Sequence, residues 1–245
     1  MSYIYNTFIF NPLYNGLIYL IDVFPWADAG IAVIILTIIV RLILFPLSKK
    51  AIVTQVRMKE IEPELNRLKE TVPDKQQQAV KVMALYKEKG VNPFSSFLVL
   101  IIQLPIIYAL YSIFINSGLP VVKDALLYSF VSSPIINMHF LGIMDIGVRS
   151  IPLSIIAAAA QFFQLHYSLS ATAPKPNTNA PKGPPSQMDM AQNMMKNMKY
   201  VFPVIVFLIS YKISAVVALY WAISSLFTLG QELVVRRHLK KHQPL

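Results

Sequence analysis

The stretch Gly30–Lys50, GIAVIILTIIVRLILFPLSKK, decides the fold class of this chain. About 20 mostly apolar residues, rising 1.5 Å each in a helix, are enough to cross the hydrocarbon core of a bilayer. Arg41 lies inside the run, about two turns or roughly 12 Å from Lys49 and Lys50. A guanidinium at that depth costs at least about 2.5 kcal/mol on insertion scales, and such residues usually face a cavity or a functional site. We interpret the run as a transmembrane helix with a functional arginine; the alternative is that Arg41 extends to the lipid headgroups.

The composition indicates an integral membrane protein. Of 245 residues, 55% are hydrophobic and only 14% are charged, which is not the balance of a soluble domain. The chain has no cysteine, so disulfides, thiolate metal sites and a lipoprotein anchor are excluded. Residues 1–16 carry no basic region typical of a cleavable signal peptide. Neither a phosphate-binding GxxxxGK[ST] motif nor HExxH occurs, and no intramembrane carboxylate pair is evident. We therefore expect no enzyme activity, no metal and no cofactor.

The remaining apolar runs predict an all-α integral membrane protein with five transmembrane helices. In the N-terminal region we expect an amphipathic helix over 12–23 that lies in the membrane interface. The alternative is that this region forms a sixth, short span. The polar block 49–91 is predicted to be a helical hairpin projecting from the membrane; the alternative is a solvated loop that serves topology alone. The five expected spans are 30–48, 94–116, 151–170, 200–211 and 213–231. Between and around them we expect an N-terminal segment 1–29, the hairpin 49–91, a loop 117–150, a disordered loop 171–199 and a basic tail 232–245.

The loop charges predict the orientation of the chain. Lys and Arg gather in cytoplasmic loops of membrane proteins. The side with 49–91, 171–199 and 232–245 holds eighteen of them, whereas the opposite side holds three, one of which is Lys212 at the turn between the last two spans. We therefore expect the N-terminus outside and the C-terminus in the cytoplasm of a bacterial plasma (inner) membrane protein.

Three ordered motifs give the chain a resemblance to a known family. They are Thr37-x3-Arg41-x4-Pro46, then YKEKGVNPFSSFLVLIIQLPIIYALY from Tyr86, and LYWAISSLFTLGQ from Leu219. With the five spans and the charged hairpin, this set closely resembles the YidC/Oxa/Alb family of membrane protein insertases. The chain departs from the family pattern at Ser225, where asparagine is common.

The resemblance implies an insertase that moves hydrophilic segments of nascent membrane proteins into the bilayer through a polar groove, without nucleotide hydrolysis. The implied groove residues are Arg41, Thr37, Gln103, Gln164 and Trp221. The tail would contact the ribosome through Arg236, Arg237, Lys240 and Lys241. Further implied partners are the lipid bilayer, the Sec translocon and the signal recognition particle receptor.

Two other classes of protein also carry polar residues within membrane helices. A small secondary transporter would usually have an internal repeat with paired broken helices, and neither is evident in this sequence. A structural membrane assembly factor would explain the spans and basic loops, but it gives no reason for Arg41.

Overall fold

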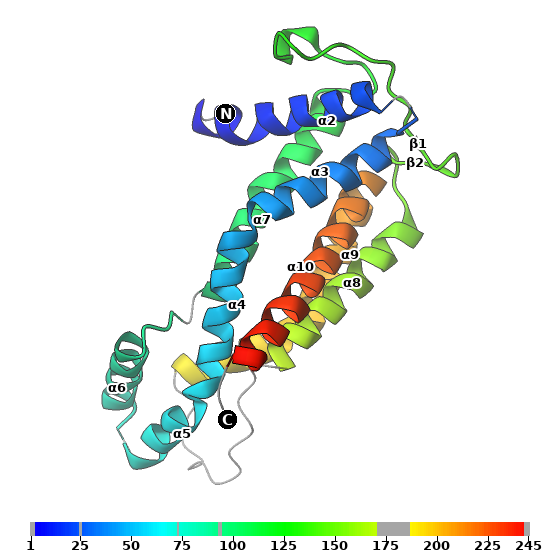
Figure 1. Cartoon of the computed structure of the whole chain (residues 1–245). Helices are drawn as coiled ribbons and strands as arrows, with labels where there is room; N and C mark the ends of the chain where they lie inside the picture. Colours follow the sequence, from blue (N-terminus) through cyan, green and yellow to red (C-terminus); the bar gives the residue numbers. More distant parts are fainter. Residues whose placement is uncertain (1–2, 25, 73, 93–94, 171–186, 243–245) are drawn as a thin grey trace.

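The computed structural model describes residues 3–24, 26–72, 74–92, 95–170 and 187–242 (Figure 1). The described chain is mostly helical, as the all-α prediction requires, and its only strands form one short antiparallel hairpin. The elements are α1 (Tyr3–Tyr5), the π-helical turn η1 (Asn6–Phe10), α2 (Asn11–Val23), α3 (Ala29–Ile43), α4 (Phe45–Glu60), α5 (Glu62–Thr71), α6 (Lys75–Glu88), α7 (Ser95–Tyr111), the π-helical turn η2 (Ser112–Asn116), the 3-10 turn η3 (Asp124–Leu126), β1 (His139–Phe140), β2 (Met144–Asp145), α8 (Ile151–Ser170), α9 (Gln187–Ile213) and α10 (Ala215–His242).

Length and composition identify fewer membrane-crossing helices than the five predicted from the sequence. Among the described residues, the stretch Ala215–Leu239 of α10 is long and apolar enough to cross a bilayer alone. The pair α3 and α4 passes the same test together but is bent by 62°, and Gln103–Asn116 is a shorter apolar helix. The five-span arrangement therefore stays a prediction.

The bend between α3 and α4 divides the stretch from which the fold was predicted. Residues 30–48 were expected to form one helix, but α3 ends at Ile43 and α4 starts at Phe45. Pro46 lies in the first turn of α4, where proline is tolerated because its missing N–H would have no partner in a helix that starts there. A continuous helix would lose the hydrogen bond from residue 46 and would clash with the proline ring, so the chain bends at Leu44.

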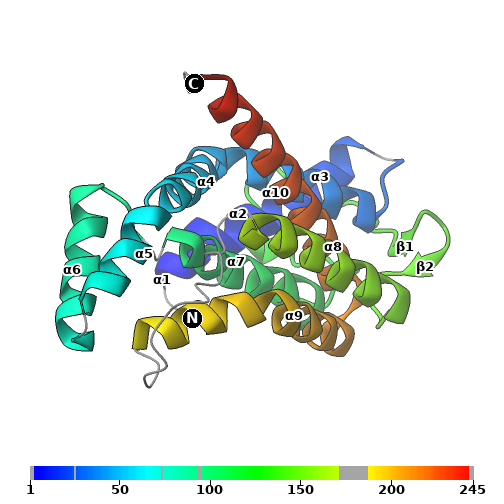
Figure 2. The same cartoon turned by 90° about the horizontal axis from the view of Figure 1, so that it is seen from below.

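Helix α10 is the centre of the bundle. It packs on α8, α3 and α9, while α8 also packs on α9 and α2 lies on α3; Figure 2 shows α10 between α3 and α8. Every residue of Ala215–Ala222 is buried. Small side chains in this run let neighbouring helices approach closely, as is usual where helices pack within a membrane.

The start of α10 is attached to the loop that precedes α8. The Ala215 N–H donates to the Val148 carbonyl at 2.7 Å and the Val216 N–H to the Ile146 carbonyl at 2.9 Å. Two of the unpaired amides of the first helical turn are thereby satisfied. The break between α9 and α10 falls at Ser214, two residues after the position expected at Lys212.

Helix α9 begins earlier than the sequence predicted. Residues 187–199 were expected to belong to a disordered loop, but they form the first half of α9. The segment has no Gly or Pro and is rich in Met, Gln and Lys, which are good helix formers. The rest of that predicted loop, residues 171–186, lies outside the described residues.

The two ends of the bundle carry different structures (Figure 1). At one end α5 and α6 form the polar hairpin, which has a small apolar core of its own: Ile61, Leu65, Val82, Tyr86 and Val91. At the other end α2 lies across the bundle, burying one wide apolar face.

Candidate functional site

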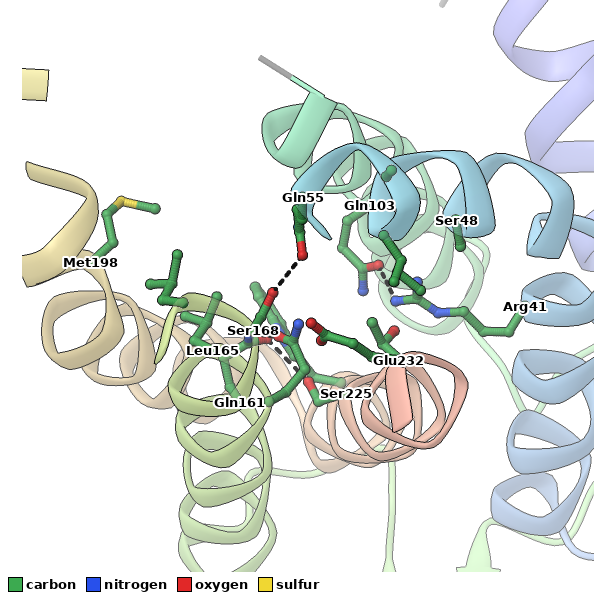
Figure 3. Close-up of a pocket in the computed structure, with 16 residues that line it drawn as sticks. Arg41, Ser48, Gln55, Gln103, Gln161, Leu165, Ser168, Met198, Ser225 and Glu232 are labelled. Atoms are coloured by element: carbon green, nitrogen blue, oxygen red, sulfur yellow. Dashed lines mark hydrogen bonds between the residues drawn. The ribbon is translucent and has the colours of Figure 1, made fainter. Parts of the chain in front are cut away.

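A cavity lies between α4, α7, α8 and α10, beside the end of α3, and polar groups are set into its mostly apolar wall (Figure 3). The cavity has about 100 Å3 of space for water-sized molecules; with the open solvent at its mouth counted, its empty space is about 980 Å3. We call this cavity the groove, and it is lined by Arg41, Ser48, Ala51, Ile52, Gln55, Gln103, Gln161, Gln164, Leu165, Ser168, Leu169, Met198, Trp221, Ser225, Thr228 and Glu232. Uncharged hydrogen-bonding groups form most of its polar surface, so the groove can receive polar groups that lipid would exclude.

Arg41 is held at one side of the groove by helices α7 and α10. Its side chain is 7% exposed. Nη2 donates to Gln103 Oε1 at 2.6 Å and also to Ser224 Oγ. Gln103 Nε2 in turn donates to Ser224 Oγ at 3.3 Å. These bonds fix the guanidinium in place.

The charge of Arg41 is not neutralised by a carboxylate in the described part of the chain. Its hydrogen-bond acceptors there, Gln103 and Ser224, are both neutral. The one carboxylate that lines the groove, Glu232, is paired with Arg236 instead. Polar dipoles therefore hold a full positive charge at the wall of the groove.

A second cluster of polar groups joins α8 to α10. Gln161 Oε1 accepts hydrogen bonds from Trp221 Nε1 at 2.8 Å and from Ser225 Oγ at 3.1 Å, and Gln161 Nε2 donates to Gln164 Oε1 at 2.7 Å. Trp221 and Gln161 are both buried. This cluster orients the two glutamines on the wall that faces α4.

An ion pair lies farther along α10. Glu232 and Arg236, one turn apart, are almost entirely buried, with Arg236 Nη2 at 2.5 Å from Glu232 Oε1. The same guanidinium donates to Gln55 Oε1 on α4 at 3.3 Å and to the Ser168 carbonyl on α8 at 3.5 Å. Ser168 Oγ also donates to Gln55 Oε1 at 3.1 Å (Figure 3). The pair thus joins α10 to both α4 and α8.

The structure brings four of the five residues expected in the groove to its wall: Arg41, Gln103, Gln164 and Trp221. Thr37 is not among the lining residues; it is 3% exposed, and its hydroxyl donates to the Val33 carbonyl at 2.6 Å. A threonine inside a helix commonly makes this bond to the preceding turn.

The basic tail is divided between buried and exposed side chains. Arg236 is buried in its ion pair, whereas Arg237 and Lys241 are exposed. The side chain of Lys240 lies outside the described part of the structure. Among the residues expected to contact the ribosome whose side chains are described, Arg237 and Lys241 are accessible.

Sequence reasoning did not select several residues that complete the site. Gln161 and Ser224 were not assigned to the groove although both fall in predicted spans, because a polar residue in a span does not by itself reveal its partner. The spacing of Glu232 and Arg236 could have predicted their ion pair, since oppositely charged residues four apart lie on one helical face. Gln55 was hidden because residues 49–91 were all assigned to the projecting hairpin.

The described residues contain no group of three or more His, Asp or Glu side chains that could hold a metal ion. The side chains that line the groove can donate and accept hydrogen bonds, and Arg41 can attract an anion. The fold and the groove define a class: a helical protein in which α10 is long and apolar enough to cross a membrane and in which a buried cation lies at the wall of a cavity between helices.

Comparison with known proteins assigns the chain to a family within that class. The sequence model of the family described as 60Kd inner membrane protein matches residues 20–242. The chain belongs to this family, known also as the YidC/Oxa1 family.

Three similar relatives are each named membrane protein insertase YidC, a role that is not enzymatic. The relative from Clostridium tetani is 30% identical over 99% of this chain and 97% of its own length. The relative from Fusobacterium nucleatum is 31% identical over 97% of this chain and 98% of its own length. The relative from Clostridium perfringens is 33% identical over 92% of this chain and 85% of its own length.

Proposed function

We propose that this chain is a membrane protein insertase of the bacterial inner membrane and that the groove receives the hydrophilic segments of nascent membrane proteins. Family membership and near full-length similarity to proteins named insertases support the function. The single observation that carries the mechanism is the charge of Arg41, which is hydrogen-bonded only to neutral acceptors among the described residues.

The groove would lower the cost of moving a polar segment out of water. An amide or hydroxyl without a partner in an apolar medium costs several kcal/mol. Glutamine and serine side chains such as Gln103, Gln161 and Ser225 can hydrogen-bond such groups during their passage. The apolar segment of the client would then leave the groove for the surrounding lipid, and its own transfer supplies the driving force without nucleotide hydrolysis.

Arg41 would attract acidic residues in the incoming segment. A carboxylate about 6 Å from the guanidinium gains about 3 kcal/mol at an effective dielectric of about 20, but less than about 1 kcal/mol in bulk water. The attraction is therefore significant only inside the groove, and it is weak enough for the incoming segment to be released afterwards.

The polar parts of the chain would bring clients to the groove. We propose that the α5–α6 hairpin receives clients or targeting partners, including the signal recognition particle receptor and the Sec translocon. Arg237 and Lys241, exposed on the tail, would bind ribosomal RNA by charge. This assignment requires the tail and the hairpin to lie in the cytoplasm, as the basic residues of the loops predict.

Gln103 offers a test that separates the charge of Arg41 from its hydrogen bonds. Gln103→Glu keeps the shape and the acceptor atom but places a carboxylate 2.6 Å from the guanidinium, which neutralises it. The variant should insert a single-span client with an acidic N-terminal tail several-fold less well than the unmodified protein. Gln103→Met, the matched control, removes the acceptor and leaves the charge, so insertion should be largely kept. The measurement is protease protection of the client tail in proteoliposomes containing equal amounts of each variant.

Substitutions of Arg41 complete this test. The expected order of insertion is Arg, Lys, Ala, Glu, because lysine keeps the charge and glutamate repels the acidic tail. A client with an uncharged tail should be inserted about equally by all four. Equal insertion of the acidic-tailed client by Gln103→Glu and Gln103→Met would contradict the charge mechanism. Loss with Arg41→Lys as severe as with Arg41→Glu would indicate that the geometry of the guanidinium is required.

A further inference from the structure

The β1–β2 hairpin presents apolar side chains at its tip. Leu141 and Ile143, in the turn between the strands, are 60% and 76% exposed. Figure 1 and Figure 2 both show the hairpin extending sideways from the bundle, near the start of α3. A tip on the surface of a protein in water would normally carry polar residues, so these two side chains need an explanation.

The backbone conformation of the turn does not favour a leucine at position 141. Leu141 has φ +52° and Gly142 has φ +70°, and the Ile143 N–H donates to the Phe140 carbonyl at 2.9 Å. Positive φ at successive turn residues suits Gly, Asn and Asp, whereas leucine rarely adopts it. A polar residue would fit the backbone better, yet the position holds a large apolar one.

The hairpin is attached by hydrogen bonds to the start of α3. Asp28 accepts a hydrogen bond from the Ile31 N–H at the start of α3 and another from the Leu141 N–H at 2.8 Å. The Ala29 N–H donates to the Asn137 carbonyl at 2.8 Å. The tip is therefore fixed at a set height relative to α3.

The exposed apolar residues continue along the chain from the hairpin into α8. Val148 is 57% exposed, and Ile151 and Ile155 in the first turns of α8 are 52% and 55% exposed. In a protein of a membrane-embedded family, apolar residues on the outer surface of such a helix face lipid. The tip is therefore followed in the chain by further exposed apolar residues, and lipid would cover those on α8.

We propose that the β1–β2 tip inserts Leu141 and Ile143 into the boundary between lipid headgroups and acyl chains, on the side of the membrane that carries the 117–150 loop. Apolar side chains gain free energy by entering this boundary without crossing the membrane. Of the charged residues in the loop, Lys123, Asp124, Asp145 and Arg149, none lies in the turn itself. The lipid bilayer, and not another protein, would therefore cover the tip.

The absence of cysteine allows a direct measurement of depth. Ile143→Cys is labelled with an environment-sensitive fluorophore in the otherwise unmodified chain and reconstituted in phosphatidylcholine vesicles containing nitroxide-bearing lipids. A nitroxide near the headgroup should quench the label strongly, and one near the end of the acyl chain should quench it weakly. Gln77→Cys is the control, because Gln77 is exposed on α6 of the polar hairpin and should not be quenched by either lipid.

A second substitution tests whether the leucine holds the tip in the membrane. Leu141→Asn suits the positive φ of the turn, so the hairpin should keep its fold while quenching at position 143 falls at least twofold. Equal quenching at positions 143 and 77 would overturn the proposal. The proposal would also be overturned if the label at position 143 stayed shielded from water in detergent, and more so at higher protein concentration. A second copy of the chain, and not the bilayer, would then cover the tip.

Discussion

Glu232 and Arg236 form an ion pair that is removed from solvent and joins three helices beside the groove. Breaking a buried pair leaves an uncompensated charge and typically costs 3–5 kcal/mol. We expect Glu232→Gln to lower the free energy of unfolding by about 3 kcal/mol, measured by denaturant titration in detergent micelles.

Two further variants show whether the charge is responsible. Arg237→Gln, a change at the exposed neighbour, should leave the free energy of unfolding nearly unchanged. The double variant Glu232→Gln with Arg236→Met should regain most of the loss, because no unpaired charge remains. If Glu232→Gln alone were as stable as Arg237→Gln, the ion pair would add nothing to the free energy of unfolding.

At the residue scale, the sequence singled out some of the residues that the structure brings to the wall of the cavity. Arg41 and Gln103 stand out because a charge or an amide inside an apolar run needs a partner. Their meeting with Ser224 could not be predicted, since it depends on how α10 is rotated against α3 and α7. Thr37 lies on the same helical face as Arg41, but helical spacing does not tell whether a hydroxyl points to a cavity or bonds to its own helix.

At the element scale, the α5–α6 hairpin can be tested through its small core. Val82 is fully buried there, whereas Val80, on the same helix, is 70% exposed. Val82→Ala should destabilise the hairpin by about 2 kcal/mol, from lost burial and the cavity that remains. Hydrogen exchange of the α6 amides should then be about thirtyfold faster, because they exchange by local opening.

Val80→Ala is the control of identical chemistry for this prediction. Its exchange rates should stay close to those of the unmodified chain, since an exposed valine contributes little burial. Similar acceleration by both variants would mean that α6 is not held by its apolar face.

The helices themselves were partly predictable from the sequence. Apolar runs located α3, α7, α8 and α10, because segment length and hydropathy are local properties. The ends were less certain: Pro46 was visible, yet whether it bends a helix or starts a new one depends on packing. The early start of α9 was missed because 187–199 is polar and follows a Pro-rich stretch.

At the scale of the whole molecule, the charge distribution predicts which end of the bundle faces the cytoplasm. Gln77 in the hairpin and Ser132 in the 117–150 loop are both exposed, and they lie in segments that the prediction places on opposite sides. Single cysteines at these positions, treated on intact cells with a membrane-impermeant thiol reagent, should be labelled at 132 and not at 77. Opening the cells should make position 77 reactive. Labelling at 77 in intact cells would reverse the orientation.

The family resemblance reached further than the tertiary contacts did, whereas the orientation stays a prediction. Both depend on features spread along the whole chain, such as the eighteen basic residues on one side against three on the other. The division of the first span and the ion pair across α4, α8 and α10 depend on contacts between distant segments, which a single sequence does not contain.

The 62° bend between α3 and α4 also has a mechanical meaning. Helix α4, with sixteen residues, is a lever about 24 Å long whose pivot is Leu44, three residues from Arg41. Tilting this lever by about 10° moves its far end by about 4 Å while Arg41, near the pivot, hardly moves. Ser48, Ile52 and Gln55 lie on this arm. A tilt would therefore widen or narrow the groove on the α4 side, against the hydrogen bonds from Ser168 and Arg236 to Gln55, and would leave the charge of Arg41 in place.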